Sequence, residues 1–495
     1  MRRLMRKLFH RDDGVAMVWL ASTVVLLIGV AGFAVDLGWM YLNASKVQRA
    51  ADSAAMAGVV HLPGFLVQAN ADAQAAAEAN GYDFGTPLNP GPDEIASVAL
   101  SDNELHVELR TQIPSFFVKV LGFDHFTITR DATAQYIKPV PLGSPNRCFG
   151  QDPTGTYCPA DPTDFWAAVS APYTLKRDGD PYSTHCVNNS NQSNCSSNNV
   201  MYAREGSYGG YYFGVEVPSG VSNVAVRVYD AAFMERPNYP NVETADERYS
   251  PGSPNNGVTT SFQLHMVDST PSDPTDNPPI AGCSWSLNPD SSDGPGDFIN
   301  EWRTLCTLAG AVTPGVYVLH VESTGIGSGT NNYSLAATSG SGPQPRVFGI
   351  NDMSIFSNKL VAGNPSQLYL VEVEPDHAGS KLELQFFDAG DASGASFMRV
   401  RDPHGNIPNC SWEVSPHHLN SMTSSGSGPC AWQTTTAGGS QLFQNQWITA
   451  VIDIPDAYTC NGPDCFWYME LELSQPNERT TWRARIIGNP VRLIP

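Results

Sequence analysis

The feature that most constrains this chain is an uninterrupted apolar run close to its N-terminus. Residues 14–35 read GVAMVWLASTVVLLIGVAGFAV and contain no charged side chain. A helix rises about 1.5 Å per residue, so this run spans roughly 30 Å, the thickness of the hydrocarbon core of a bilayer. The sequence therefore predicts a transmembrane helix that starts at Gly14, contains Trp19 and is followed directly by Asp36.

A basic stub, residues 1–13, precedes the run. Its basic side chains are Arg2, Arg3, Arg6, Lys7 and Arg11. Because basic flanks stay in the cytoplasm, we expect a single-pass protein of the cytoplasmic membrane with its N-terminus inside. The rest of the chain would be exported, to the periplasm or to the cell exterior. A cleaved signal peptide has a similar start, but its apolar core is shorter and it ends at a cleavage site followed by a turn.

Here the helical pattern continues instead, through DLGWMYLNASKVQRAADSAAMAGVV. Small and apolar residues recur every three or four positions and form a stripe, called here the small-residue face: Leu37, Met40, Ala44, Val47, Ala51, Ala54 and Gly58. Small side chains let another backbone approach closely. We therefore expect this face to pack against a partner helix or against the chain's own globular part. Pro63-Gly64 ends the helix.

A small α+β module is predicted over residues 36–138. An alanine-rich second helix covers residues 65–80. The segments IASVAL and LHVELRTQI alternate apolar and polar residues, as paired strands do, around the turn Ser101-Asp102-Asn103. Pro114 begins a short helix, PSFFVKVLG, and FTITRDATAQYI returns as a strand.

Charge and cysteine content agree with export. The formal net charge is −21 although the first residues are basic, so nucleic acid is not an expected partner. All ten cysteines follow residue 147, and an even number in an oxidising compartment indicates disulfides. The simplest pairing is sequential: Cys148–Cys158, Cys186–Cys195, Cys283–Cys306, Cys410–Cys430 and Cys460–Cys465. A zinc site is the alternative, but no CxxC pair occurs.

The order of these segments resembles a known family. The GVAMVW opening, the VQRAADSAAMAGV segment and the SFFVKVLGF…ATA ending resemble the N-terminal region of TadE/TadG-like proteins of Flp (tight adherence) pilus assembly, over about residues 11–138. This resemblance implies a membrane-anchored, pilin-like accessory component. Its partners would be pilus assembly proteins of the cytoplasmic membrane or pilus subunits, with lipid around the single helix.

Two departures refine this resemblance. Processed pseudopilins carry a glutamate five residues after the cleavage glycine, and counting from Gly14 that position is Trp19. The chain is therefore expected to be TadG-like, with a permanent anchor, and not a filament subunit. Some TadG-like proteins carry a von Willebrand factor A metal site, but Asp268-Ser269-Thr270-Pro271-Ser272 fits its Asp-x-Ser-x-Ser pattern poorly. No metal site is expected there.

The remaining chain contains an internal repeat. Residues 211–233 match residues 368–390, and GCSWSLNP (282–289) matches NCSWEVSP (409–416). INEWRT (299–304) likewise matches QNQWIT (444–449). The repeated segments are short alternating strands between turn-forming clusters, which is typical of antiparallel sandwiches. We predict two jelly-roll-like β-sandwiches, over 146–340 and 345–495, in a chain that is α+β and mostly β.

Within the repeat, the matched pairs Trp285/Trp412 and Trp302/Trp447 are interpreted as core aromatics, with ligand platforms as the alternative. His417-His418 is read as part of a solvated loop.

No catalytic motif was found: GxSxG, HExxH, a P-loop and a Rossmann fingerprint are all missing from the sequence. No cofactor is expected. Calcium is the alternative at two acidic clusters, Asp268, Asp273 and Asp276, and Asp290, Asp293 and Asp297. The sequence thus predicts a membrane-anchored, non-enzymatic component of Flp/Tad-type pilus assembly. The alternative is a tethered surface-binding or carbohydrate-binding adhesin.

Overall fold

The fold is described from a computed structural model, which divides the chain into two compact units. Unit 1 comprises residues 1–138 and 489–495, and unit 2 comprises residues 139–488. The structure describes residues 13–62, 65–86, 89–101, 103–136, 140–143, 147–158, 165–170, 210–230, 233–235, 246–248, 259–268, 270, 273–287, 301–324, 329–357, 365–388, 394–415, 424–440, 442–443, 446–460, 465–472, 478–487 and 491–494.

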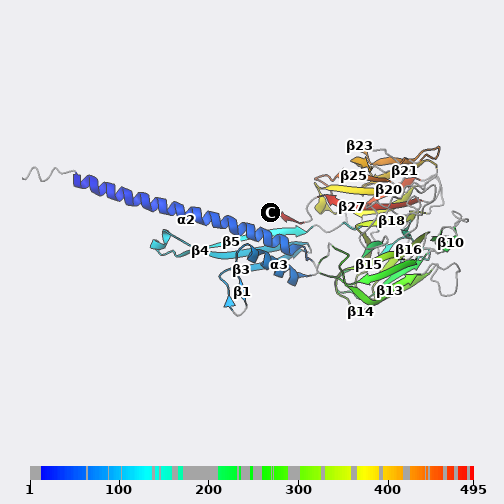
Figure 1. The fold of residues 1–495 in the computed structure, drawn as a ribbon, viewed down its shortest axis with the longest axis horizontal. Coiled ribbons are helices and arrows are strands. Elements are labelled where there is room, and N and C mark those ends of the chain that lie inside the picture. The colour runs from blue at the N-terminus through cyan, green and yellow to red at the C-terminus, as the bar shows by residue number, and fades with distance from the viewer. Residues whose placement is uncertain are drawn as a thin grey trace, which may run out of the picture. The chain divides into compact units, whose positions relative to one another are not determined.

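Unit 1 is an α+β module built on one long helix (Figure 1). Its elements are α2 (Asp13–Val59), α3 (Leu66–Ala79), β1 (Gly85–Thr86), β2 (Asn89–Pro90), β3 (Glu94–Ser101), β4 (Glu104–Pro114), the 3-10 helix η1 (Val118–Leu121), β5 (His125–Tyr136) and β28 (Val491–Ile494). The main sheet is antiparallel, in the order β28-β5-β4-β3. The predicted order of two helices, two strands, a short helix and a strand is confirmed.

The strands of unit 1 cover one face of α2. Along β4, buried and exposed residues alternate, so that Leu105, Val107 and Leu109 all point into the core. The core also contains buried alanines from both helices: Ala50, Ala51, Ala54, Ala55, Ala69, Ala73 and Ala77. Because alanine adds little bulk, the helices and the sheet can approach each other closely. The C-terminal half of α2 is thus a core helix, whereas Figure 1 shows its N-terminal half extending alone.

The last strand of the chain belongs to unit 1. β28 pairs antiparallel with β5, with Val491 opposite Tyr136, and Arg492 donates to Gln135 Oε1 at 2.7 Å and 2.9 Å. In Figure 1 it is the red strand beside the cyan β5. The sequence placed residues 489–495 in the second repeat. Instead, unit 2 is inserted between two neighbouring strands of the unit 1 sheet.

Unit 2 is almost entirely β. The strands of its first half are β6 (Cys148–Phe149), β7 (Phe165–Ser170), β8 (Gly210–Val217), β9 (Ser222–Asp230), β10 (Phe233–Glu235), β11 (Asp246–Arg248), β12 (Thr259–His265), β13 (Pro279–Leu287), β14 (Trp302–Ala311), β15 (Gly315–Thr324) and β16 (Gly329–Thr338). One layer contains β14, β9, β16 and β7, and the other has the order β13-β12-β15-β8-β17, in which β17 is Arg346–Ile350. The rings of Phe262 in β12 and Tyr333 in β16 meet between the layers, 5.4 Å apart.

The second half repeats this arrangement. Its elements are β17 (Arg346–Ile350), β18 (Asp352–Ser357), β19 (Ser366–Glu372), the 3-10 helix η5 (Pro375–His377), β20 (Lys381–Asp388), β21 (Ser396–Arg401), β22 (Asn409–Val414), β23 (Ser425–Pro429), β24 (Ala431–Thr435), β25 (Gln446–Asp453), β26 (Phe466–Glu472) and β27 (Glu478–Ile487). The pairing β25-β20-β27-β18 matches β14-β9-β16-β7, and β19-β26-β21 matches β8-β15-β12. Equivalent aromatic pairs accompany it: Trp302 with Tyr229, and Trp447 with Phe387, each 5.5 Å apart.

Both layers run on from one half into the other. In the first layer β7 pairs with β18, with Phe356 opposite Trp166. In the second layer Leu142 bridges β17 and β19, pairing with Gly349 on one side and Val371 on the other. One hydrophobic cluster contains buried residues of both halves. The two halves are therefore one continuous sandwich with a shared core.

One pair of segments with matching sequence lies in different layers of the sandwich. GCSW lies in β13, which pairs with β12, whereas NCSW lies in β22, which pairs with β25 in the other layer. The disulfides still have a common effect. Cys283–Cys306 joins β13 to β14, and Cys410–Cys430 joins β22 to the residue before β24, so each bond connects the two layers. A short Cys-Ser-Trp match does not specify which layer its strand enters.

Removal of β28 should loosen the edge of the unit 1 sheet. We expect a chain lacking residues 489–495 to exchange the amide hydrogens of Thr133 and Gln135 faster than the full chain, because these amides face β28 and lose their acceptors, whereas the amide of Tyr136 donates to Asn103 on the other side. Amides of unit 2 should keep their protection. The control is Leu493→Ala, which keeps the backbone of β28 and changes a half-exposed side chain. Unchanged exchange at Thr133 and Gln135 after the deletion would contradict this pairing.

The seam between the halves should make unit 2 unfold as one body. Ile355 in β18 is fully buried, so Ile355→Ala should cost about 2–5 kcal/mol of unfolding free energy and Ile355→Val about 0.5–1.5 kcal/mol. We expect denaturant unfolding, followed by tryptophan fluorescence, to remain a single transition whose midpoint falls for both variants. Two separate transitions, of which only one moves, would mean that the halves fold independently.

Candidate membrane-anchor site

The N-terminal half of α2 has the composition of a membrane span. The most apolar 18-residue stretch of this helix has a mean hydropathy of 2.3, and 6% of that stretch is buried. Met17, Trp19 and Val25 are all at least 70% exposed. Gly14 lies in the first turn of the helix. By length and composition this helix can cross a membrane, as the sequence predicted.

The small-residue face is occupied by the chain's own module. Ala44, Val47, Ala51 and Ala54 are buried in the core that α2 forms with α3 and the sheet. At Gly58 a Cβ atom would lie 2.5 Å from the carbonyl oxygen of Ala69, so only glycine allows α3 to come this close. Of the two partners left open for this face, the structure shows the chain's own globular part. A partner helix therefore has no access to it.

Leu37 is different from the rest of that face. Its side chain is 42% exposed, and the buried part of the stripe begins about two turns later, at Ala44. Leu37 therefore lies between the exposed apolar helix and the packed module.

Asp36 lies between the exposed apolar part of α2 and the part that packs in the module. Its carboxylate is 1% exposed and accepts three backbone hydrogen bonds from the loop between β4 and β5. Phe116 N donates to Oδ1 at 2.9 Å, and Phe117 N and Val118 N donate to Oδ2 at 2.8 Å and 2.7 Å. These amides are at the start of η1, where backbone N–H groups have no acceptor within the helix. Asp36 thus caps η1 from another element and fixes the loop to α2.

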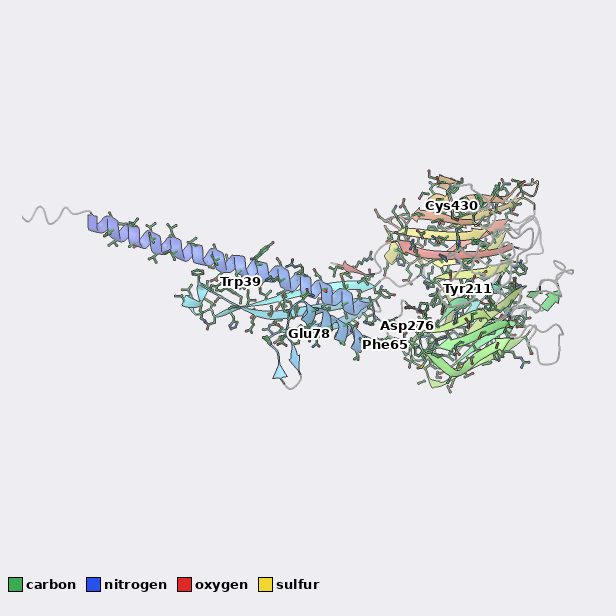
Figure 2. The ribbon with its side chains drawn as sticks, in the orientation of Figure 1. Trp39, Phe65, Glu78, Tyr211, Asp276 and Cys430 are labelled. Carbon is green, nitrogen blue, oxygen red and sulfur yellow. A yellow bond between two sulfur atoms is a disulfide. The ribbon has the colours of Figure 1, made fainter. Side chains whose placement is uncertain are left out.

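Two aromatic contacts accompany the cap. Trp39, labelled on α2 in Figure 2, meets Phe116 edge to face at 5.5 Å. Lys46 lies 6.0 Å from the centre of the Trp39 ring, on the side toward the packed module. A tryptophan beside a lysine just beyond an apolar span is typical of the interface between a bilayer and water.

The sequence identified Asp36 but not its partners. It treated PSFFVKVLG as a short helix and did not assign a role to the exposed apolar residues of this loop, which are Phe116, Phe117, Val120, Leu121 and Phe123. The available signal was the clustering of apolar residues in a turn-like segment between Pro114 and Gly122, too short to bury them on itself.

Four disulfides occur among the described residues. The bonded pairs are Cys148–Cys158, Cys283–Cys306, Cys410–Cys430 and Cys460–Cys465. These are sequential neighbours, and Cys186 and Cys195 lie outside the described residues. All four bonds are in unit 2, so they stabilise the sandwich and not the anchor.

The first disulfide closes a loop that Asp152 organises. Burial raises the pKa of Asp152, but hydrogen bonds from Cys158 N, Thr154 and Trp302 Nε1, together with Tyr157 N, outweigh it and lower that pKa to about 2. Trp302 Nε1 donates to this carboxylate at 2.8 Å. Trp447, which is matched to Trp302 in the repeat, is 3% exposed. Trp285 and Trp412 are half-buried and pack against the core.

In the acidic cluster that suggested calcium, Asp268 and Asp276 both lie near the hydroxyl group of Thr270. Thr270 Oγ1 lies 3.1 Å from Asp268 and 2.9 Å from Asp276, and burial together with the neighbouring Asp276 carboxylate raises the pKa of Asp268. Within the described part of the chain, no three His, Cys, Asp or Glu side chains are grouped so that they could hold a metal ion. Asp290, Asp293, Asp297 and the His417-His418 pair lie outside it.

The cap at Asp36 generates a testable prediction. Asp36→Asn leaves one acceptor oxygen in place of two and turns an NH₂ group toward backbone donors. We expect faster amide hydrogen exchange at residues 116–118 in the full chain in detergent micelles. The control is Asp52→Asn on the same helix, where the carboxylate accepts from Gln48 one turn away. If Asp36→Asn left the protection of residues 116–118 unchanged, the carboxylate would not be what holds the loop.

Comparison with known proteins bears on unit 1. Residues 14–61 match the Tad family, described as Flp pilus-assembly TadE/G-like. This segment is the whole described apolar helix, its buried continuation and the turn that follows. No curated protein matches the chain.

Solved structures add no argument about fold or function. The tandem domain CBM22-1-CBM22-2 of Paenibacillus barcinonensis Xyn10C aligns with 82% of this chain and 95% of its own, at 8% identity and a TM-score of 0.13. Tripeptidyl peptidase 2 aligns with 84% of this chain and 39% of its own, at 7% identity and a TM-score of 0.17. Both scores are too low for a shared fold. The family match is the comparison that bears on function: residues 14–61 of this chain are similar to the TadE/G-like segment of Flp pilus assembly.

Proposed function

We propose that this chain is a membrane-anchored, non-enzymatic component of Flp/Tad-type pilus assembly. The observation that supports this most directly is the TadE/G-like match over residues 14–61, which covers the apolar helix and its packed continuation. Helix α2 would anchor the protein in the cytoplasmic membrane, with the basic stub inside and both units exported.

The buried small-residue face restricts where membrane partners could bind. Because Ala51 and Ala54 are fully buried in unit 1, replacing them would unfold the module and would not report on a partner. Within unit 1, the surfaces that assembly proteins or pilus subunits could bind include the exposed apolar side of α2 and the polar face of the sheet. On β4 that face presents Glu108, Arg110 and Gln112, alternating with the core residues.

The rival adhesin hypothesis assigns the function to unit 2. It predicts a row of exposed aromatic side chains on one sandwich face, as a platform for carbohydrate. Among the described residues of unit 2, the large apolar side chains that are exposed are Met266 and Ile487, and neither is aromatic.

The connection between the units allows a sharp test in the source organism. Tyr136 and Val491 are opposite each other in an antiparallel pair, so a short turn that contains Asn-Gly can replace residues 137–490 and leave unit 1 closed. Filaments and surface attachment would be imaged in a gene deletion and in deletion strains carrying either the full chain or this shortened chain.

We expect the deletion to abolish filaments and the full chain to restore them. Restoration by the shortened chain would assign assembly to unit 1, and its failure would show that assembly also needs unit 2. Intact filaments with lost attachment in the deletion strain would contradict the assembly role and favour a tethered adhesin. Intact filaments and normal attachment would contradict both.

A further inference from the structure

The loop between β4 and β5 presents a compact group of exposed apolar side chains. Its members, called here the apolar loop, are Phe116, Phe117, Val120, Leu121 and Phe123, and each is at least 50% exposed, with Val120 at 91% and Leu121 at 75%. Water-exposed apolar patches of this kind mark contact with a protein or a membrane. By contrast, the strands that lead into the loop bury one face and expose polar residues on the other.

The apolar loop lies against the end of the apolar run of α2. A Cβ atom at Gly32 would come within 2.8 Å of the Phe117 ring, so this ring sits directly on the helix backbone. One turn later, Asp36 holds the amides of residues 116–118. Residues 32–35 are the last turn of the predicted span, where a helix that crosses a bilayer leaves the hydrocarbon.

The exposed surface of the loop is continuous with the exposed surface of the helix. Phe33 and Val35, next to Gly32, are each more than half exposed, like the apolar residues before them. Any lipid that covers this part of α2 therefore also reaches the loop. Since α2 and the loop belong to the same compact unit and are joined by three hydrogen bonds, they share one position relative to a membrane.

The charges of the segment suit the boundary of a bilayer. Lys119, inside the apolar loop, is 65% exposed at its side chain, and its ammonium group lies 3.8 Å from Asp124. A lysine among apolar residues can extend its charge to the headgroups while its methylene groups remain with the apolar side chains. Trp39 and Tyr41 lie on the following turn of α2, where aromatic residues are enriched at membrane interfaces.

We infer that residues 115–124 form a second membrane contact, a loop that enters the leaflet on the side of unit 1 beside the transmembrane helix. The partner is lipid: acyl chains around the five apolar side chains and headgroups around Lys119. Asp36 is the positioning residue, because it satisfies the amides that would otherwise face hydrocarbon. This inference rests on α2 crossing a membrane, which is part of the proposed function.

Site-specific photocrosslinking of the full chain tests this inference. The protein would be reconstituted in vesicles of phosphatidylethanolamine and phosphatidylglycerol, with p-benzoylphenylalanine in place of Val120 or, separately, Leu121. Both positions are highly exposed, so the substitutions should not disturb folding. The positive control has the same residue in place of Val25 on α2, and the matched negative control has it in place of Leu100, an exposed apolar residue of β3.

We expect lipid adducts, detected as a mass gain of one phospholipid, at positions 25, 120 and 121. We expect no such adduct at position 100. An adduct at position 25 with none at positions 120 and 121 would overturn the inference while leaving the anchor intact. Crosslinks from positions 120 and 121 to a second copy of the chain would also overturn it, by making the patch a protein interface. No adduct at position 25 would overturn the anchor and this inference together.

Discussion

Most of unit 1 depends on α2 being one unbroken helix in two different surroundings. Over its first half the residues with described side chains are apolar or small, and all of them are exposed except Gly32, which Phe117 covers. Over its second half, alanines and valines are buried against protein. A helix needs no outside partner for its internal backbone hydrogen bonds, so it can pass from lipid into a packed module without a break. A buried carboxylate, Asp36, stands where these surroundings meet. It is tolerated there because three backbone amides solvate it.

The pairing of β28 with β5 sets how unit 2 is attached. The chain leaves the sheet after Tyr136 and returns at Val491, its direct partner, so unit 2 has two connections that emerge side by side. A load on unit 2 is thereby divided between two neighbouring strands, and β5 is held on its other side by β4 over its whole length. A single connection would transmit the same load through one strand.

The sequence predicted local elements well because their causes are local. The apolar run, the alanine periodicity and the alternating strands of unit 1 are each determined by neighbours within a few residues. Pairings between distant segments were not predictable in this way. β28 lies more than 350 residues from β5, and its four residues carry no signal that distinguishes them from another strand of the repeat.

The repeat shows the same distinction on a larger scale. The order of strand pairs and the Trp–aromatic contacts were retained in both halves, and each Trp–aromatic pair belongs to a small hydrophobic cluster separate from the shared core. The GCSW and NCSW segments diverged in layer because a cysteine at the edge of either layer can reach the other one.

The apolar loop and the buried small-residue face have a common explanation. Once α3 and the sheet fill the small-residue face, that face of α2 is closed to a partner helix. Exposed apolar area remains where the sheet ends, at Phe117, Val120 and Leu121, level with the last turn of the apolar run. A helix alone leaves the tilt and rotation of an exported module undetermined, because it provides one axis. A second apolar contact beside that axis fixes the rotation, so that the polar face of β4 and the strand pair β5–β28 keep one orientation toward whatever binds them.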